Sequence, residues 1–238
     1  MSVQINYKNT ILGKSSVNHI LFTDENFNIL SLKKSLSNKD YSFIVDLLKA
    51  KDLKKKFLIF DISLKKRIIL ISLKKNILSS DIENLGAKFY ETFKDFKIKN
   101  YIFNSDTLPR NLKGNIGNFL HGLKLRSYTF EKYKSKKNKI NISINVIGKN
   151  KPSNKEQIKF KAIEEGTYLT RDLVSEPGNV LHPDEYARRL NLLKKDGLKV
   201  NIYDDRKLKK LGMNALLGVG QGSIRGSYLV TMEWNGAK

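Results

Sequence analysis

Short apolar runs alternate with segments of helical apolar spacing through the first 150 residues, and this alternation limits the fold more than any other feature. The predicted strands are Val3–Tyr7, Val17–Phe22, Phe57–Phe60, Ile68–Ile71, Tyr101–Phe103 and the alternating residues from Ile140 to Val146. The predicted helices are Tyr41–Ala50, Ser79–Phe96 and Asn115–Leu123. Strands interleaved with helices indicate an α/β fold, in which helices pack on a sheet.

Two features of these segments carry more specific expectations. Phe57–Phe60 and Ile68–Ile71 are continuous apolar runs rather than alternating ones, which predicts strands covered on both faces. Ser79–Phe96 has an amphipathic pattern, and Ser80-Asp81 is expected to cap the start of this helix.

A turn-rich stretch without an apolar anchor, Gly148–Pro152, predicts a domain boundary that separates residues 1–150 from residues 151–238. Directly after it, Ser153 and Glu156 have the spacing of a capping box, which predicts a helix start. Apolar residues then recur at helical spacing until Pro177-Gly178, so we expect one connecting helix of about 20 residues.

The remaining chain predicts a second, shorter α/β segment. Pro183 is expected in the first turn of a helix, where Asp184 and Glu185 complement the positive helix start, and this helix ends before Gly197. The other predicted elements are a strand at Leu198–Ile202, a short helix around Leu208 and Leu211, and a strand at Tyr228–Glu233.

The chain is strongly basic, and the excess charge lies in its first part. Its 238 residues include 45 Lys+Arg and 23 Asp+Glu, a net charge of +22. Residues 1–150 carry 29 basic and 12 acidic side chains, net +17, whereas residues 151–238 carry 16 and 11, net +5. The basic runs are Lys54–Lys56, Lys65–Arg67, Lys74–Lys75 and Lys132–Lys139.

A field of this sign attracts phosphate backbones or acidic lipid surfaces. Lys far outnumbers Arg, however, and bidentate base reading prefers Arg. We therefore favour a solvated lysine surface with weak, sequence-independent attraction to nucleic acid over a dedicated nucleic-acid site.

The absence of cysteine excludes disulfides, Cys-ligated zinc, iron–sulfur clusters and thiol nucleophiles, and fits a reducing compartment. No apolar run is long enough to cross a bilayer, and Met1–Asn9 lacks the basic start and apolar core of a secretory signal. We expect a cytoplasmic protein without a membrane partner.

No group of residues in the sequence defines a catalytic site by its spacing. His19, His121 and His182 have no metal-ligand spacing, and each is expected to be structural. The segment Gly218–Gly222, GVGQG, lacks the third glycine of a dinucleotide fingerprint, so we expect a tight, sterically demanding turn beside the sheet. The acidic clusters are Glu164-Glu165, Asp172, Glu176, Asp184-Glu185 and Asp204-Asp205, and helix faces, helix starts and turns account for most of them.

Three blocks of sequence carry a family resemblance. The residues from Thr167 to His182 with the next proline read TYLTRDLVSEPGNVLHP, and Gly122–Lys137 reads GLKLRSYTFEKYKSKK. Leu211–Arg225 reads LGMNALLGVGQGSIR and is followed by Tyr228–Gly236, YLVTMEWNG. In this order and at these separations they resemble the leucyl aminopeptidase (cytosol aminopeptidase) family, whereas residues 1–120 resemble it only in architecture.

The resemblance implies a macro-domain-like α/β N-terminal domain, a long connecting helix and the incomplete start of an α/β metallopeptidase domain. It also implies a hydrolase that removes N-terminal amino acids from peptides, holds two divalent metal ions, manganese or zinc, and assembles into hexamers. The family's metal-binding lysine and carboxylates begin in a glycine-rich block shortly after the segment that matches Tyr228–Gly236, and this sequence ends at Lys238. We therefore assign no catalytic, cofactor-binding or metal-binding residue, do not assign Lys238 as the metal-binding lysine, and expect the 238-residue chain to bind no metal and to be inactive.

Two hypotheses of different classes remain. The first is an N-terminal part of a leucyl-aminopeptidase-like metallopeptidase. The alternative is a non-catalytic basic binding or assembly module that contacts nucleic acid or other subunits. A reading frame that continues past Lys238 into a metal-ligand block would favour the first, and a stop codon at that position would favour the second.

Overall fold

The computed structural model describes residues 3–8, 17–109, 115–136 and 141–236, and the chain divides into two compact units. Unit 1 is Met1–Tyr168 and unit 2 is Leu169–Lys238. The division falls inside the long helix α4 (Asn154–Ser175), whereas the boundary expected from sequence, between residues 150 and 151, stays a prediction.

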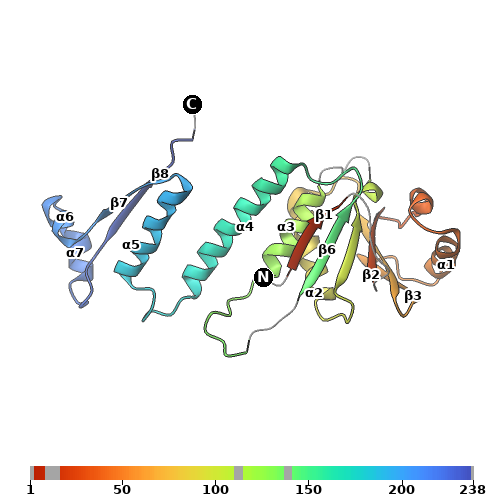
Figure 1. Cartoon of the computed structure of the whole chain (residues 1–238), viewed down its shortest axis with the longest axis horizontal. Helices are drawn as coiled ribbons and strands as arrows, with labels where there is room; N and C mark the ends of the chain where they lie inside the picture. Colours follow the sequence, from red (N-terminus) through yellow and green to blue (C-terminus); the bar gives the residue numbers. More distant parts are fainter. Residues whose placement is uncertain (1–2, 9–16, 110–114, 137–140, 237–238) are drawn as a thin grey trace. The chain divides into compact units, whose positions relative to one another are not determined.

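Unit 1 is built on a six-stranded sheet in the order β1-β6-β5-β2-β4-β3. Figure 1 labels four of these strands, β1, β6, β2 and β3. All neighbouring strands pair in parallel except β3, which is antiparallel to β4. The strands are β1 (Val3–Tyr7), β2 (Val17–Asp24), β3 (Phe57–Ser63), β4 (Lys66–Leu73), β5 (Asn100–Asn104) and β6 (Ile142–Ile147). The helices are η1 (Leu30–Lys34), α1 (Asn38–Leu48), α2 (Ser79–Phe93), η2 (Ser105–Thr107) and α3 (Ile116–Arg126). The predicted α/β class is confirmed; Ile140, expected at the start of the last strand, lies outside the described residues.

The sheet has an apolar core on each face. One core joins α2 and α3 to the sheet, and the other joins α1 and η1 to β2, β3 and β4. In β4, Ile69 and Ile71 belong to the first core, and Ile68 and Leu70 to the second. The continuous apolar run in this strand is therefore covered on both faces, as predicted, because successive side chains point to opposite sides of a sheet.

The helices α2 and α3 approach each other closely at two glycines. A Cβ atom added to Gly86 would lie 1.9 Å from the carbonyl oxygen of Phe119, and one added to Gly122 would lie 1.9 Å from that of Glu83. Each glycine thus faces the backbone of the opposite helix, and no larger residue fits without a shift of one helix.

The predicted cap of α2 is wrong. The helix begins at Ser79, its N-cap is Leu78 with extended backbone, and no side chain caps it. Ser80 and Asp81 lie inside the first turn because the chain becomes helical before them, although Asp81 still complements the positive helix start.

The turn between β6 and α4 is held by specific contacts. Gly148 has φ +100°, and an added Cβ there would lie 2.6 Å from Oγ of Ser105. The backbone amide of Lys149 donates to Oδ1 of Asp106 over 2.7 Å. The capping box that follows is confirmed, since Ser153 N donates to Oε2 of Glu156 (2.8 Å) and Glu156 N donates to Oγ of Ser153 (3.3 Å). α4 then runs for 22 residues, close to the predicted length.

Unit 2 contains a two-stranded antiparallel sheet and short helices. Its elements are α5 (Pro183–Asn191), η4 (Leu192–Asp196), β7 (Lys199–Tyr203), α6 (Asp205–Lys210), α7 (Asn214–Gly220) and β8 (Leu229–Glu233). Pro183 occupies the first turn of α5, and Gly197, at φ +90°, closes η4, both as expected from sequence.

The prediction for the GVGQG segment is wrong. Gly218–Gly220 forms the end of α7, and a Cβ added to Gly218 or Gly222 would have no atom within 4 Å. Only Gly220 is tightly contacted, by Ser227. The preceding Ala-Leu-Leu favours a helix strongly enough to continue it through these glycines.

Candidate functional sites

The three histidines lie on different elements and share no ligand partners. His19 lies on β2, His121 on α3 and His182 directly before α5. Within the part of the chain that the structure describes, no three His, Cys, Asp or Glu side chains come together in a way that could hold a metal ion.

His121 and Glu164 form a largely buried pair between α3 and α4 of unit 1. Nδ1 of His121 lies 3.5 Å from Oε1 of Glu164 without hydrogen-bond geometry, and its ring contacts Phe160 at a centroid distance of 5.3 Å. Burial, and then the negative charge of Glu164, raise the pKa of Tyr7 to about 12. These groups attach the first half of α4 to unit 1.

In unit 2, Arg225 joins the loop after α7 to the start of α5. Its Nη1 lies 3.1 Å from Nδ1 of His182 and 3.5 Å from the carboxylate of Asp184, and His182 is itself hydrogen-bonded to Asp184. Desolvation opposes ionisation, yet the bond to His182 and the charge of Arg225 hold the pKa of Asp184 below its usual value. The arrangement holds a loop against a helix start.

A second ionic network links α5 to the residue that follows α4. Glu185 accepts hydrogen bonds from Arg188 (2.6 and 2.7 Å) and Arg189 (2.8 Å), and these bonds lower its pKa to about 2. Arg189 also donates to Glu176 over 2.9 Å, and the side chain of Glu176 is only 2% exposed. Asp204 and Asp205 have local roles too, because Asp204 caps α6 and Asp205 accepts from the amide of Ser227.

A cavity of about 490 Å³ opens at the carboxyl ends of β2 and β5. The strand order reverses there, since β2 lies between β4 and β5, and α/β sheets usually bind ligands at such a point. The polar side chains of this cavity, however, accept hydrogen bonds from backbone amides and so stabilise its rim. Asp24 accepts from the amide of Asn28 (2.8 Å), Asp106 from that of Lys149, and Thr107 from that of Phe22 (2.9 Å).

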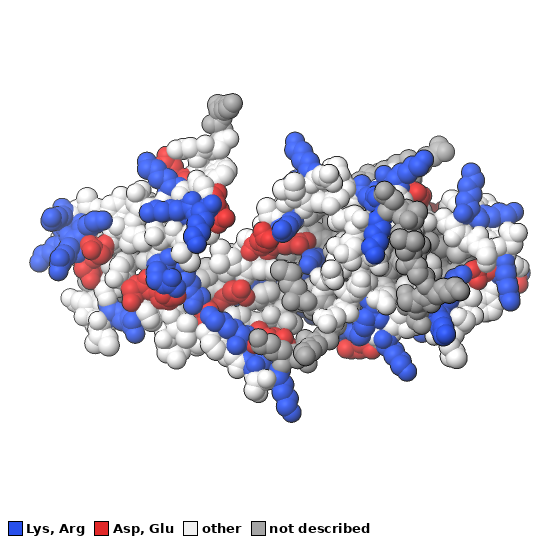
Figure 2. Space-filling model, viewed as in Figure 1, with Lys and Arg blue, Asp and Glu red and all other residues white. Residues whose placement is uncertain are grey.

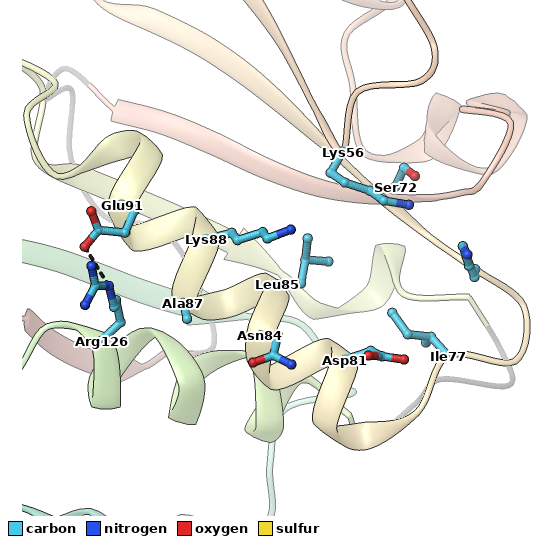
Figure 3. A pocket seen from close by; sticks show the side chains of 11 residues that line it. Lys56, Ser72, Ile77, Asp81, Asn84, Leu85, Ala87, Lys88, Glu91 and Arg126 are labelled. Atoms are coloured by element: carbon cyan, nitrogen blue, oxygen red, sulfur yellow. Dashed lines mark ion pairs between the residues drawn. The ribbon is translucent and has the colours of Figure 1, made fainter.

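A second cavity, of about 530 Å³, lies between α2 and the open end of the β3–β4 hairpin, and we call it the basic groove (Figure 3). The amide of Ser72 donates to the carbonyl of Lys56 over 3.1 Å, which fixes the two residues side by side at this end of the hairpin. Lys88 projects from α2 on the other side. The lining residues are Lys56, Ser72, Lys74, Ile77, Asp81, Asn84, Leu85, Ala87, Lys88, Glu91 and Arg126.

Sequence reasoning found the basic runs but not this groove. Lys56 and Lys74 belong to two separate runs, and the pairing of β3 with β4 places both on one rim. Lys88 lies outside every run, so no local signal marks it. Elsewhere, Lys and Arg side chains are interspersed with other residues on the face shown in Figure 2, and Lys137–Lys139 lies outside the described residues.

The fold of the whole chain is that of leucine aminopeptidase structures. A tomato leucine aminopeptidase mutant matches 97% of this chain and 50% of its own length with a TM-score of 0.73 at 20% identity. The cytosol aminopeptidase from Coxiella burnetii matches 96% of this chain and 46% of its own with a TM-score of 0.64 at 14% identity. At these identities the likeness shows the fold alone.

The sequence comparisons find similarity to the cytosol aminopeptidase family. Residues 168–238 match the model for the catalytic domain of the cytosol aminopeptidase family. The chain is 44% identical to a probable cytosol aminopeptidase of Chelativorans sp. over 124 residues, which are 49% of this chain and 25% of that protein. It is 46% identical over 129 residues to one of Phytoplasma mali, 51% of this chain and 26% of that protein. The predicted resemblance to the leucyl aminopeptidase family is confirmed, and the match spans about a quarter of each curated relative.

No helix within the described ranges has both the length and the apolar character that crossing a bilayer requires.

Proposed function

We propose that this chain is the N-terminal part of a leucyl-aminopeptidase-like metallopeptidase that removes N-terminal amino acids from peptides. The observation that carries the proposal is the family match over residues 168–238, which covers unit 2 and names a catalytic domain. In this proposal residues 1–150 form a macro-domain-like N-terminal domain. Residues 151–238 comprise the connecting helix, α4, and the incomplete start of the catalytic domain. Peptide substrates, assembly into hexamers and a cytoplasmic location are proposed on the same resemblance.

The complete enzyme would use two divalent metal ions, manganese or zinc. The described residues do not fit such a pair, because no three potential ligands among them come together. We therefore derive no catalytic step from this chain and assign it no catalytic or metal-binding residue.

The proposal predicts that the 238-residue chain does not hydrolyse leucine amide, whereas the product of the same reading frame extended past Lys238 does. Both proteins are incubated with leucine amide and manganese or zinc, with a metal-only blank and a chelator control. Activity of the extended protein that the chelator abolishes supports the proposal. An inactive extended protein contradicts it, and chelator-sensitive turnover by the 238-residue chain contradicts the assignment of the metal ligands to the extension.

The net charge of +17 on residues 1–150 favours a second candidate, a basic binding or assembly module. We expect its nucleic-acid binding to be weak and to fall steeply as the salt concentration rises. The affinity would come from counterions released from the nucleic acid, and added salt makes that release less favourable. Retention of a labelled duplex is measured at about 50 mM and about 200 mM salt, the range over which counterion release is pronounced. Tight binding to one sequence that persists at the higher salt would favour the module over a solvated lysine surface.

A further inference from the structure

Three lysine side chains line the basic groove without a carboxylate partner. Lys56, Lys74 and Lys88 form no ion pair with any described Asp or Glu. The segments outside the described residues contain no Asp or Glu at all, so they supply no side-chain carboxylate either. These three charges are therefore available to a ligand.

The two acidic residues of the groove do not cancel this charge. Glu91 forms ion pairs with Arg126 (2.7 Å; Figure 3) and with Lys94 (2.9 Å). The hydrogen bond from Lys94, followed by the charge of Arg126, holds the pKa of Glu91 below its usual value despite desolvation. Asp81 lies in the first turn of α2, where it complements the helix dipole. Three free ammonium groups thus face one carboxylate, and the groove attracts anions.

The groove also offers a neutral hydrogen-bonding group and an apolar surface. Ser72 is only 4% exposed, and among the described residues its hydroxyl has no hydrogen-bond partner. Leu85 and Ile77 provide aliphatic surface beside it. None of the described lining residues is aromatic, so the groove cannot stack a nucleobase.

We propose that the basic groove binds a small organic phosphate, such as a sugar phosphate, through Lys56, Lys74, Lys88 and Ser72. A phosphate monoester carries a charge of about −1.5 to −2 and three strong acceptor oxygens, which three ammonium groups can satisfy from different sides. A volume of about 530 Å³ lies within the usual range of small-molecule sites. The aliphatic surface suits the carbon skeleton of such a ligand better than a base.

The test uses the 238-residue chain and calorimetric titration with glucose 6-phosphate, inorganic phosphate and glucose. The triple variant Lys56→Gln, Lys74→Gln, Lys88→Gln should weaken glucose 6-phosphate binding by at least about tenfold, because three charge-assisted contacts are lost. The matched control is the triple variant Lys33→Gln, Lys34→Gln, Lys39→Gln, which removes the same charge from exposed lysines of η1 and α1 in the same unit. This control should change the affinity for glucose 6-phosphate by less than about twofold. Glucose should not bind, and inorganic phosphate should bind more weakly than glucose 6-phosphate.

Several results would overturn the proposal. If both triple variants lose affinity for glucose 6-phosphate equally, the overall positive charge of the unit, and not the groove, attracts the ligand. Absence of glucose 6-phosphate binding at millimolar concentration would refute the site directly. If a short DNA duplex binds more tightly than glucose 6-phosphate, and only the groove variant loses this binding, the groove is a nucleic-acid site instead. The single variant Lys88→Gln, at an exposed position, guards against a folding defect in the triple variant and should itself weaken binding.

Discussion

The close approach of α2 and α3 makes Gly86→Ala the sharpest test of the packing in unit 1. The new Cβ would lie 1.9 Å from the carbonyl oxygen of Phe119 and 2.8 Å from its carbon. Since ordinary contact begins near 3.4 Å, the helices must separate by roughly 1.5 Å. Overpacking costs about 1–3 kcal/mol, and the upper value applies because the obstacle is backbone rather than a mobile side chain.

Alanine also favours the helical state by about 1 kcal/mol relative to glycine, so the net loss in the free energy of unfolding is about 2 kcal/mol. For a unit of this size that corresponds to a decrease in Tm of about 4–8 °C. Gly166→Ala in α4 is the matched control, because no atom lies within 4 Å of its added Cβ. It should be neutral or stabilise by up to about 1 kcal/mol.

Urea unfolding followed by circular dichroism measures both variants, with the fluorescence of Trp234 recorded in parallel. Trp234 is the only tryptophan and lies in unit 2, so its transition should stay in place when only unit 1 is destabilised. Gly122→Ala should behave like Gly86→Ala, since its Cβ meets the backbone of Glu83 at the same distance. If the free energy of unfolding of Gly86→Ala lies within about 0.5 kcal/mol of that of the unmodified chain, the helices are not packed as closely as described.

Two further predictions concern the helix starts. Ser153→Ala removes one half of the capping box and should lower the free energy of unfolding by about 1 kcal/mol in the same urea assay; no change would mean that the cap does not stabilise α4. The pKa of Glu185 is lowered from 4.5 to about 2 by Arg188 and Arg189, so its contribution to stability is complete above pH 4.5 and disappears as the pH falls towards 2. Glu185→Gln should therefore reduce the fall in Tm between pH 5 and pH 2, and an unchanged profile would contradict the pairing.

Local signals were sufficient for most of the elements of unit 1. The run from Ile68 to Ile71 predicts a doubly covered strand because its apolar residues have no polar alternation, and β4 has that environment. The capping box was predicted equally well, because its two partners lie three residues apart. In both cases the sequence signal lies within a few consecutive residues, although the residues that cover β4 come from distant helices.

Features that depend on distant partners could not be read in this way. In the sequence alone, Gly86 only lowers the stability of the predicted helix. Its role in the close packing of α2 and α3 becomes apparent in the structure, where the carbonyl of Phe119 lies against it. The basic groove likewise requires the pairing of β3 with β4 and the position of α2 before Lys56 and Lys88 line the same cavity. The cap of α2 failed for a different reason: Ser80 is a good capping residue by type, but the helix had already begun.

The part of the chain that matches the family model is not the part with the large apolar cores. Unit 1 contains both apolar cores, whereas the buried apolar residues described in unit 2 are Ala187, Val200 and Leu208. Yet the family model matches residues 168–238, where Val219 and Trp234 are 88% and 65% exposed. A two-stranded sheet with so small a core is marginal in water, so contacts within unit 2 do not account for large apolar residues at these positions. Burial against further parts of a catalytic domain would account for them, which is what the proposal of an N-terminal part of a metallopeptidase requires.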